Sequence, residues 1–241
     1  MIPPRLTSDL ALFLDFDGTL VEIAPTPDSV VVPDHLPGIL AETADALGGA
    51  LAIVSGRTLD DVTRYLHPLV APGSGSHGVE RRRADGSIAA PDPEIGRVAA
   101  EIIAGVAAEI GTQPGLLFED KPWSAALHYR GAPALEAECI AVMQRVVAVY
   151  PGWEVIIGKM IVEARFAGFS KASAVDAFMQ EAPFKGRVPV FIGDDRTDED
   201  GMQAAEKHGG YGIKIGEGSS IARYRLTNPQ DVWNYLAASR V

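Results

Sequence analysis

The sequence predicts an α/β protein whose parallel sheet belongs to a doubly wound core, with an α+β domain inserted into it. Apolar runs that end in acidic residues and glycine occur near both ends of the chain, whereas the middle carries helices that alternate with hairpins. The chain has 241 residues, of which 47% are hydrophobic and 22% are charged. This length suits one large domain or a domain with an insertion, and the composition is that of a globular protein with a real core.

The first part of the chain reads as two strand–loop–helix units. Residues 10–17 form an apolar run that ends in acids before Gly18, which is typical of a buried parallel strand. Residues 34–47 are expected to form a helix, with Asp34 as its N-cap. A second apolar strand over 51–54 precedes Ser55-Gly56-Arg57, and Thr58 can cap the helix that follows.

The middle of the chain changes pattern. Two helices, each followed by a hairpin, indicate an α+β unit with an antiparallel sheet: helices at 93–110 and 134–150, and strands at 116–119, 124–129, 153–157 and 161–166. We therefore expect a core at residues 1–81 and 168–241, and an inserted domain at residues 82–167. The core pattern then returns, with helices at 170–180, 199–208 and 231–239 and strands at 188–192 and 211–215.

Charge and cysteine content narrow the class of partner. The formal net charge of −11 argues against nucleic acid and anionic membranes, because both need basic patches. The single cysteine, Cys139, cannot form a disulfide within the chain, and its neighbours indicate a helix interior and a buried thiol. The first residues lack the apolar region of a signal peptide. We expect a cytoplasmic monomer that acts on a small molecule.

Acidic residues follow two predicted strands of the core. Asp15 and Asp17 lie at the carboxyl end of the first strand, and Asp194 and Asp195 at that of a late one. Ligands of open α/β sheets bind at the carboxyl ends of the strands, and carboxylates gathered there repel one another unless a cation lies between them. Single acids at such positions are often helix caps or turn residues. Two matching pairs instead favour a site for a hard cation such as Mg²⁺.

Two further residues have types suited to phosphate. Ser55 follows a strand, where its hydroxyl and its backbone N–H can donate to phosphate oxygens. Lys171 lies in the first turn of a predicted helix, where its charge can neutralise a phosphate. Alone, each would be read as a turn residue or a solvated side chain.

The order of these residues resembles the four motifs of the haloacid dehalogenase superfamily. The string Asp15-Phe16-Asp17-Gly18-Thr19 is similar to its DxDGT motif, and Ser55, Lys171 and Gly193-Asp194-Asp195 with Asp198 follow in the family's order. The resemblance implies a Rossmann-like core with a cap domain inserted between the second and third motifs, which is where the α+β pattern lies.

The resemblance also implies a role for each residue. Asp15 would be the nucleophile that carries the phosphoryl group, and Asp17 the acid and base for the leaving oxygen and the water. Mg²⁺ would be bound by Asp15, Asp194 and the backbone carbonyl of Asp17, with Asp195 and Asp198 supporting metal or water from outside that set. Thr19, Ser55 and Lys171 would bind or stabilise the transferring phosphate.

Several longer strings resemble the trehalose-6-phosphate phosphatases of this superfamily: Ile53 to Arg57, His77 to Glu80, Glu119 to Lys121, His128 to Arg130, and the string GDDRTDED from Gly193 to Asp200. This resemblance implies hydrolysis of trehalose 6-phosphate in trehalose biosynthesis. It also implies a set of substrate-binding residues that adds Arg57, His77, Glu119, Lys121, Arg130, Lys159 and Glu163 to Thr19. Glu119 and Lys121 alternate along one predicted strand and so share a face, where mixed charges suit the hydroxyls of a disaccharide. One face of an antiparallel sheet is also commonly just solvated.

Three alternatives stay open at this point. The ester could be sucrose 6-phosphate, mannosyl-3-phosphoglycerate or glucosyl-3-phosphoglycerate, although the string GDDRTDED speaks against most of these. A phospho-receiver domain also combines an acid pair, a phosphorylated Asp and a Lys, but receivers are short and uncapped. A non-catalytic sugar-binding protein is disfavoured by the intact set of Asp15, Asp17, Lys171 and Asp194.

Overall fold

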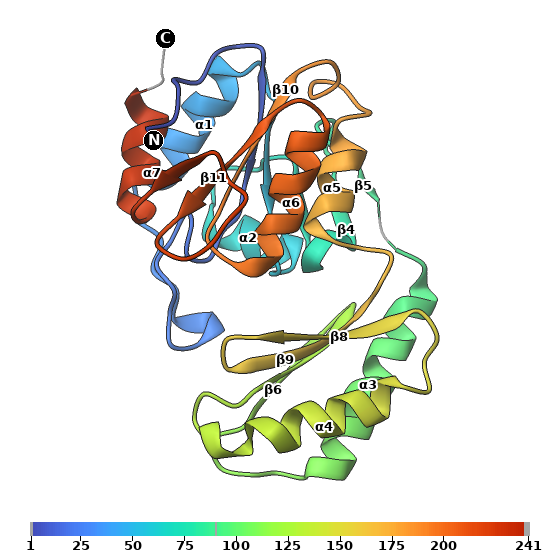
Figure 1. Cartoon of the computed structure of the whole chain (residues 1–241). Helices are drawn as coiled ribbons and strands as arrows, with labels where there is room; N and C mark the ends of the chain where they lie inside the picture. The colour runs from blue at the N-terminus through green and yellow to red at the C-terminus, as the bar shows by residue number, and fades with distance from the viewer. Residues whose placement is uncertain (1, 90, 239–241) are drawn as a thin grey trace. The chain divides into compact units, whose positions relative to one another are not determined.

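The computed structural model describes residues 2–89 and 91–238, without the side chains of Pro27, Asp120 and Lys121. The chain forms two compact units, one from residues 1–90 and 170–241 and the other from residues 91–169 (Figure 1). Among the described residues, no helix is both long and apolar enough to cross a membrane.

The first unit is built on an eight-stranded sheet with the order β12-β11-β10-β1-β2-β3-β4-β5. The strands from β12 to β3 are parallel, and β4 and β5 continue the sheet in antiparallel pairing. Their bounds are Leu10–Leu14 (β1), Leu51–Val54 (β2), Gly73–Gly75 (β3), Glu80–Arg82 (β4), Ile88–Ala89 (β5), Val188–Gly193 (β10), Tyr211–Ile215 (β11) and Tyr224–Leu226 (β12). This is the predicted parallel sheet.

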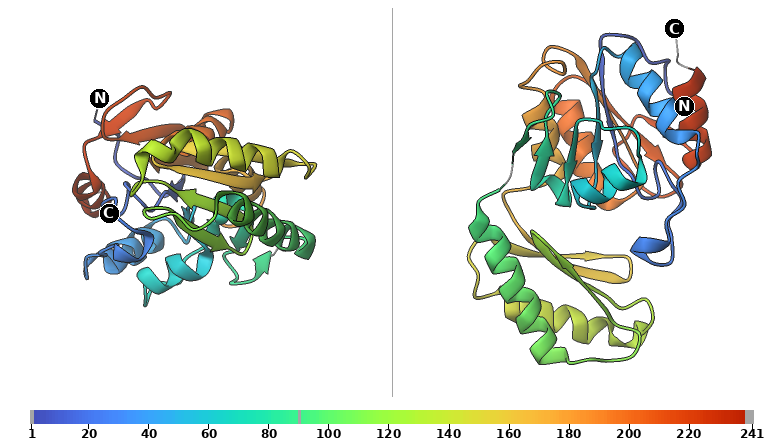
Figure 2. Two further views of the ribbon diagram at one scale, coloured as in Figure 1. Left: turned by 90° about the horizontal axis from the view of Figure 1, so that it is seen from below. Right: turned by 180° about the vertical axis from the view of Figure 1, so that it is seen from behind.

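Helices cover both faces of this sheet. α1 and α7 pack against each other on one face, and α5 and α6 do so on the other (Figures 1 and 2). The helices span Leu36–Ala46 (α1), Leu59–Tyr65 (α2), Lys171–Phe178 (α5), Arg196–Lys207 (α6) and Pro229–Ala238 (α7), and two 3-10 turns span Pro27–Ser29 (η1) and Ser76–Gly78 (η2). Because both faces are covered, every residue of β1, β2 and β11 is buried, which explains why β1 and β2 are continuous apolar runs and β11 is apolar except for Lys214.

The second unit has a four-stranded antiparallel sheet with the order β6-β7-β9-β8, covered on one face by two helices. The bounds are Pro93–Ile110 (α3), Leu117–Lys121 (β6), Ser124–His128 (β7), Pro133–Leu135 (η3), Glu136–Val147 (α4), Trp153–Gly158 (β8) and Ile161–Phe166 (β9). The predicted order of helices and hairpins is confirmed. Cys139 is a buried free thiol in α4, in the core between the helices and this sheet.

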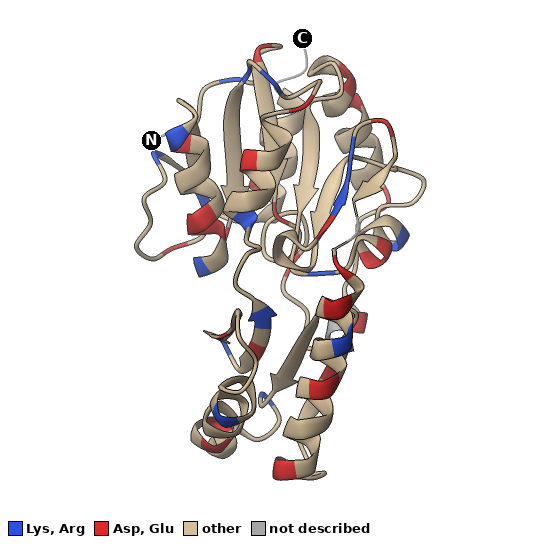
Figure 3. Cartoon of the chain, turned by 90° about the vertical axis from the view of Figure 1, so that its right-hand side faces the viewer, with Lys and Arg blue, Asp and Glu red and all other residues tan. Residues whose placement is uncertain are grey.

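Charged residues lie on the helices, in loops and on outer strands (Figure 3). The four central strands β1, β2, β10 and β11 contain one charged residue among them, Lys214 of β11. Charge that does occur beside these strands is therefore concentrated at their ends, where the candidate site lies.

Several predicted boundaries are wrong. Residues 82–89 belong to the first unit, because β4 and β5 extend its sheet by backbone pairing; the sequence had placed them in the inserted domain. α6 begins at Arg196 rather than 199, because Asp195 accepts hydrogen bonds from two backbone N–H groups of the first turn. The N-cap of α1 is His35 rather than Asp34, and it makes no side-chain capping bond.

Candidate active site

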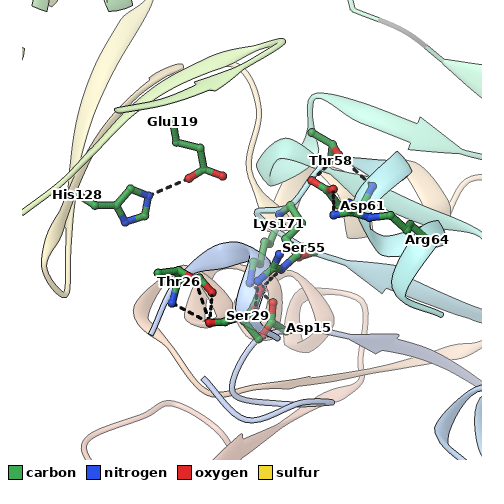
Figure 4. A network of polar contacts seen from close by, with 12 residues as sticks. Asp15, Thr26, Ser29, Ser55, Thr58, Asp61, Arg64, Glu119, His128 and Lys171 are labelled. Atoms are coloured by element: carbon green, nitrogen blue, oxygen red, sulfur yellow. Dashed lines mark hydrogen bonds and ion pairs between the residues drawn. The ribbon is translucent and has the colours of Figure 1, made fainter. Parts of the chain in front are cut away.

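The ends of three adjacent parallel strands bring the motif residues together. In the sheet, Leu14 of β1 pairs with Ile53 of β2 on one side and with Ile192 of β10 on the other. Asp15, the segment that begins with Ser55, and Gly193-Asp194 therefore leave the sheet at the same edge, and Asp15, Ser55 and Lys171 lie together there (Figure 4). The backbone N–H of Asp15 still donates to the carbonyl of Ile192, at 3.0 Å, so the sheet itself fixes where its side chain begins.

A buried ion-pair network joins Asp15 to the start of two helices. Lys171 Nζ lies 2.7 Å from Asp15 Oδ1 and 2.6 Å from Asp198 Oδ1. All three side chains are almost fully buried, with exposed fractions of 3% for Lys171, 6% for Asp15 and 0% for Asp198. Lys171 occupies the first position of α5 because Ser170 caps that helix, and Asp198 lies in the first turn of α6. The lysine is thus held between two carboxylates from distant segments.

Asp198 also holds the loop that follows β10. Its Oδ2 accepts hydrogen bonds from the backbone N–H groups of Asp194 and Asp195, both at 3.0 Å. Gly193 is required beside it, because a Cβ at that position would lie 2.2 Å from the Asp198 carboxyl carbon. The side chain of Asp198 therefore fixes both the lysine and the backbone of the two acids before it.

Asp15, Asp194 and Asp198 form a carboxylate cluster, with one oxygen of each within 4.8 Å of the others. Burial raises the pKa of Asp15 from 3.8 to about 7, and burial together with Asp198 and Asp195 raises the pKa of Asp194 to about 7. Gly18, at φ +80°, packs against this cluster so closely that a Cβ would lie 2.3 Å from an Asp194 carboxylate oxygen. The acids are therefore crowded in a way that disfavours their charged forms.

The charge of the site matches a divalent cation. Asp15, Asp194, Asp195 and Asp198 carry four negative charges when ionised, and Lys171 with Lys214 carries two positive ones. The net charge of these six side chains is then two negative charges. Because the negative charge lies on oxygen ligands, it fits a hard divalent ion such as Mg²⁺. Asp195 differs from its neighbours: although burial opposes it, Lys171 and hydrogen bonds from Asp198 and Thr197 lower its pKa to about 2.

Lys214 is a member of this site that the sequence reasoning missed. It is buried, at 6% exposure, in β11, and its Nζ donates to the backbone carbonyls of Asp194 and Ile215. Its charge also favours ionisation of the Asp194 side chain, lowering the pKa of that carboxyl against the effect of burial. The sequence feature that could have identified Lys214 as a site residue is its position within the otherwise apolar string Tyr211–Ile215.

Asp17 does not lie in the carboxylate cluster. Its two oxygens accept hydrogen bonds from Arg57, at 2.6 Å from Nε and 2.8 Å from Nη2. The Arg57 guanidinium lies 5.6 Å from the ring centre of Phe16 and 5.2 Å from that of Tyr65, which fixes its plane. Burial opposes the charge of Arg57, but Asp17 more than offsets this and raises the pKa of the guanidinium.

Three further predicted residues of the first unit, Thr19, Ser55 and His77, follow the strands β1, β2 and β3. The buried hydroxyl of Thr19 has no hydrogen-bond partner among the described residues, so it can bind a ligand. Ser55 Oγ accepts from the Arg57 N–H at 3.1 Å, which leaves its own hydrogen to be donated. The backbone N–H of Ser55 was expected to bind phosphate, but it donates to the Ser74 carbonyl within the sheet instead. The backbone N–H of His77 donates to the Ser55 carbonyl, and this residue holds a left-handed φ of 56°, a conformation that costs energy for a residue other than glycine.

The predicted residues of the second unit lie on or beside the polar face of its sheet. Glu163 is buried and accepts a hydrogen bond from Ser124, whereas Glu119 is half-buried and lies 2.8 Å from His128 (Figure 4). Arg130 and Lys159 are exposed, the first just after β7 and the second in the turn between β8 and β9. The side chain of Lys121 lies outside what the structure describes.

Known proteins resemble this chain over nearly its whole length. The sequence profile of the family described as trehalose-phosphatase matches residues 13–230. The chain is 42% identical to the trehalose-6-phosphate phosphatase of Escherichia coli strain K12, over 97% of this chain and 87% of that protein. It is 43% identical to a probable trehalose-phosphate phosphatase of Sinorhizobium fredii, over 88% of this chain and 80% of that one.

Solved structures agree on the fold. A trehalose-6-phosphate phosphatase related protein superposes with a TM-score of 0.81 at 24% identity, covering 95% of this chain and 96% of that one. A haloacid dehalogenase-like hydrolase from B. subtilis superposes with a TM-score of 0.68 at 14% identity, covering 94% and 99%. The predicted haloacid dehalogenase fold is confirmed, and, on the sequence match, the chain belongs to the trehalose-phosphatase family.

Proposed function

We propose that this protein hydrolyses trehalose 6-phosphate to trehalose and inorganic phosphate, with Asp15 as the nucleophile. The observation that carries the proposal is the buried network of Asp15, Lys171 and Asp198 at the carboxyl end of the parallel sheet, in a member of this family. A carboxylate next to a fixed ammonium group suits attack on a phosphate ester, because the lysine stabilises charge on the transferring group.

In the first step, a carboxylate oxygen of Asp15 attacks phosphorus and the bond between phosphorus and the sugar oxygen breaks. The departing oxygen takes a proton from Asp17, and the phosphoryl group stays on Asp15 as an acyl phosphate. Lys171 remains protonated throughout, because Asp15 and Asp198 outweigh its burial and raise its pKa well above the usual value. It therefore acts as a fixed charge and not as an acid.

In the second step, water attacks phosphorus, the bond to Asp15 breaks and inorganic phosphate leaves. Asp17 takes the proton from this water and so returns to the state that the next cycle needs. To do either, Asp17 must turn away from Arg57, which holds both of its oxygens in the structure. Thr19 and Ser55 offer hydroxyl groups to phosphate oxygens, and His77, next to Ser55, borders the same position.

A divalent cation, Mg²⁺ in this proposal, would be bound by the carboxylates of Asp15 and Asp194 and by the backbone carbonyl of Asp17. Its charge would neutralise the crowded carboxylates and the phosphate oxygens. Asp198 would support the site from outside the ligand set, because its oxygens already accept bonds from Lys171, Asp194 and Asp195. Asp195 would do the same from the start of α6.

The second unit would serve as the cap domain that recognises the sugar. Glu119 and Glu163 can accept hydrogen bonds from sugar hydroxyls, while Lys121, Arg130 and Lys159 can donate them. In the first unit, Arg57, which is bound to Asp17, would belong to the substrate-binding residues.

Phosphate release from a panel of esters tests the proposal. The panel holds trehalose 6-phosphate, sucrose 6-phosphate, glucose 6-phosphate and mannosyl-3-phosphoglycerate, each with Mg²⁺ and with EDTA. We expect a strong, metal-dependent preference for trehalose 6-phosphate. Preference for another ester would overturn the assignment of the sugar, and the absence of metal-dependent release from every ester would overturn the phosphatase mechanism.

A further inference from the structure

The polar face of the second unit's sheet places two carboxylates on either side of one small residue. Glu119 of β6 and Glu163 of β9 both pair with Ala126 of β7, so the three residues form one row across three strands and share a face. With strands about 4.8 Å apart, the backbones of the two glutamates are about 10 Å apart. Only a methyl group lies between them in the row.

Each glutamate is held by a different neighbour of Ala126 along β7. Ser124 Oγ donates to Glu163 Oε1 at 2.7 Å, and His128 Nε2 lies 2.8 Å from Glu119 Oε2. Ser124 and His128 each stand two residues from Ala126, in opposite directions, so both belong to the same face. The two carboxylates are therefore drawn toward opposite ends of β7 and away from each other.

These hydrogen bonds are separate from the core that stabilises the unit. The core lies on the other face of the sheet, where Ala125, Leu127, Val162 and Ala164 pack against α3 and α4. This core contains none of the residues that form the two hydrogen bonds, namely Ser124, Glu163, His128 and Glu119. Removing a hydrogen bond on the polar face should therefore leave the packing of the unit intact.

Fixing a glutamate before ligand arrives matters because its long side chain otherwise loses rotamer freedom on binding. Ionised Glu119 can only accept hydrogen bonds, so His128 must carry its proton on Nε2 for this contact. Ser124 is 2% exposed and Glu163 is 6% exposed, so their bond is shielded from water.

We propose that Ser124 and His128 are positioning residues that set the direction of the Glu163 and Glu119 carboxylates for the hydroxyls of the sugar. This inference rests on the proposed function, because it assigns the two glutamates to sugar recognition. The ligand that fits this arrangement is polyhydroxylated and has hydrogen-bond donors on two sides. Neither Ser124 nor His128 takes part in the transfer of phosphate.

The test compares hydrolysis of trehalose 6-phosphate with that of p-nitrophenyl phosphate, which lacks a sugar. Ser124→Ala and His128→Leu should each raise KM for trehalose 6-phosphate about 10-fold, the loss expected for one hydrogen bond to a charged group. Activity on p-nitrophenyl phosphate should change less than about 2-fold, because the Asp15 network is untouched. Ser124→Thr and His128→Gln keep a donor near the same place and should restore most of the affinity.

Two further measurements separate positioning from a general loss of structure. In an Asp15→Asn background, calorimetry should show about 10-fold weaker binding of trehalose 6-phosphate when Ser124→Ala or His128→Leu is added. Arg145→Gln removes an exposed ion pair with Glu109 on the helical side of the same unit, and it should leave KM and binding unchanged.

The outcomes distinguish this inference from the proposed function. A wild-type enzyme without preference for trehalose 6-phosphate would overturn both. An active, selective wild type whose Ser124→Ala and His128→Leu variants keep its KM would overturn the positioning roles alone. Equal losses on both substrates, without rescue by Thr or Gln, would also overturn them, because they would show a purely structural effect.

Discussion

The two units fix their charged side chains in different ways. In the first unit, Lys171 bridges Asp15 and Asp198 with all three side chains at most 6% exposed. In the second unit, Glu119 and His128 meet on a sheet face with exposed side-chain fractions of 30% and 22%. Groups that must act on phosphorus gain from burial, because electrostatic interactions are stronger there. Of the two glutamates proposed to bind hydroxyls, Glu119 stays partly accessible, whereas Glu163 is 6% exposed and is held by the buried Ser124.

The comparison predicts that changes in the two units affect different kinetic quantities. Changes in the buried network should lower turnover of every ester. Changes on the polar face of the second unit should affect only esters that carry the sugar.

Asp15→Asn should lower kcat by about 10⁵-fold on every phosphate ester, as removal of a nucleophile does in other enzymes that form covalent intermediates. The amide has nearly the same shape, and it removes a buried carboxylate whose charged form burial disfavours, so the protein should fold. Steady-state phosphate release and circular dichroism measure the two properties. A folded variant with near-normal turnover would refute the role of Asp15.

Asp194→Asn should weaken Mg²⁺ binding at least about 100-fold, because a direct ligand should matter no less than the outer partners whose loss costs 10- to 100-fold. Titration of the free protein by calorimetry measures the affinity. Asp176→Asn is the matched control, since Asp176 pairs with His208 near the C-terminal ends of α5 and α6 and lies outside the carboxylate cluster. Equal affinities of the two variants would remove Asp194 from the metal site.

Glu163→Gln should lower kcat/KM for trehalose 6-phosphate by about 10- to 100-fold and leave p-nitrophenyl phosphate almost unaffected. The amide nitrogen would present donors where the sugar needs an acceptor, which leaves buried polar groups unpaired. Parallel assays on the two esters check this. A loss of similar size on both would place Glu163 with the chemical machinery and would erase the contrast between the units.

The stability of the metal-free protein should fall as pH rises from about 4 to about 7. Burial raises the pKa values of Asp15 and Asp194 from 3.8 to about 7, so the folded state binds more protons than the unfolded state across this window. The lowered pKa of Asp195 acts in the opposite direction, but only below about 3.8. Urea unfolding in EDTA at pH 5 and pH 7.5 measures the effect, which Mg²⁺ should reverse at the higher pH.

A rise in the free energy of unfolding over that range without metal would contradict the crowding of the acids. No change on adding Mg²⁺ at pH 7.5 would contradict cation binding at the same cluster. Both readings use the stability of the protein and not its activity, so they remain independent of the substrate.

The sequence predicts an element correctly where the pattern that marks it lies within a single segment. The strands at 211–215 and 161–166 have the predicted bounds, since alternation or continuous apolar character marks them directly. Thr58 caps α2 as expected, through a bond to the Asp61 N–H. The motif acids were recognisable because each follows a buried strand whose carboxyl end is marked by glycine.

Contacts between distant segments could not be predicted from local sequence patterns. The strand-like run predicted at residues 10–17 ends at Leu14, and Asp17 turns to Arg57, 40 residues away. Lys214 meets Asp194 only because Gly193 and Lys214 pair across β10 and β11. The short edge strand β12 and the antiparallel strands β4 and β5 form by pairing with neighbouring strands. Each has too few residues for its sequence pattern to predict a strand.

Trapping of the covalent intermediate tests whether Asp15 carries the phosphoryl group. Trehalose 6-phosphate labelled with ³²P is mixed with enzyme and Mg²⁺, and the reaction is quenched in acid within milliseconds. We expect label on the protein that survives acid, is released by hydroxylamine as an acyl phosphate is, and is absent from Asp15→Asn. Rapid turnover with no protein-bound label, or the same label on Asp15→Asn, would contradict phosphoryl transfer to Asp15.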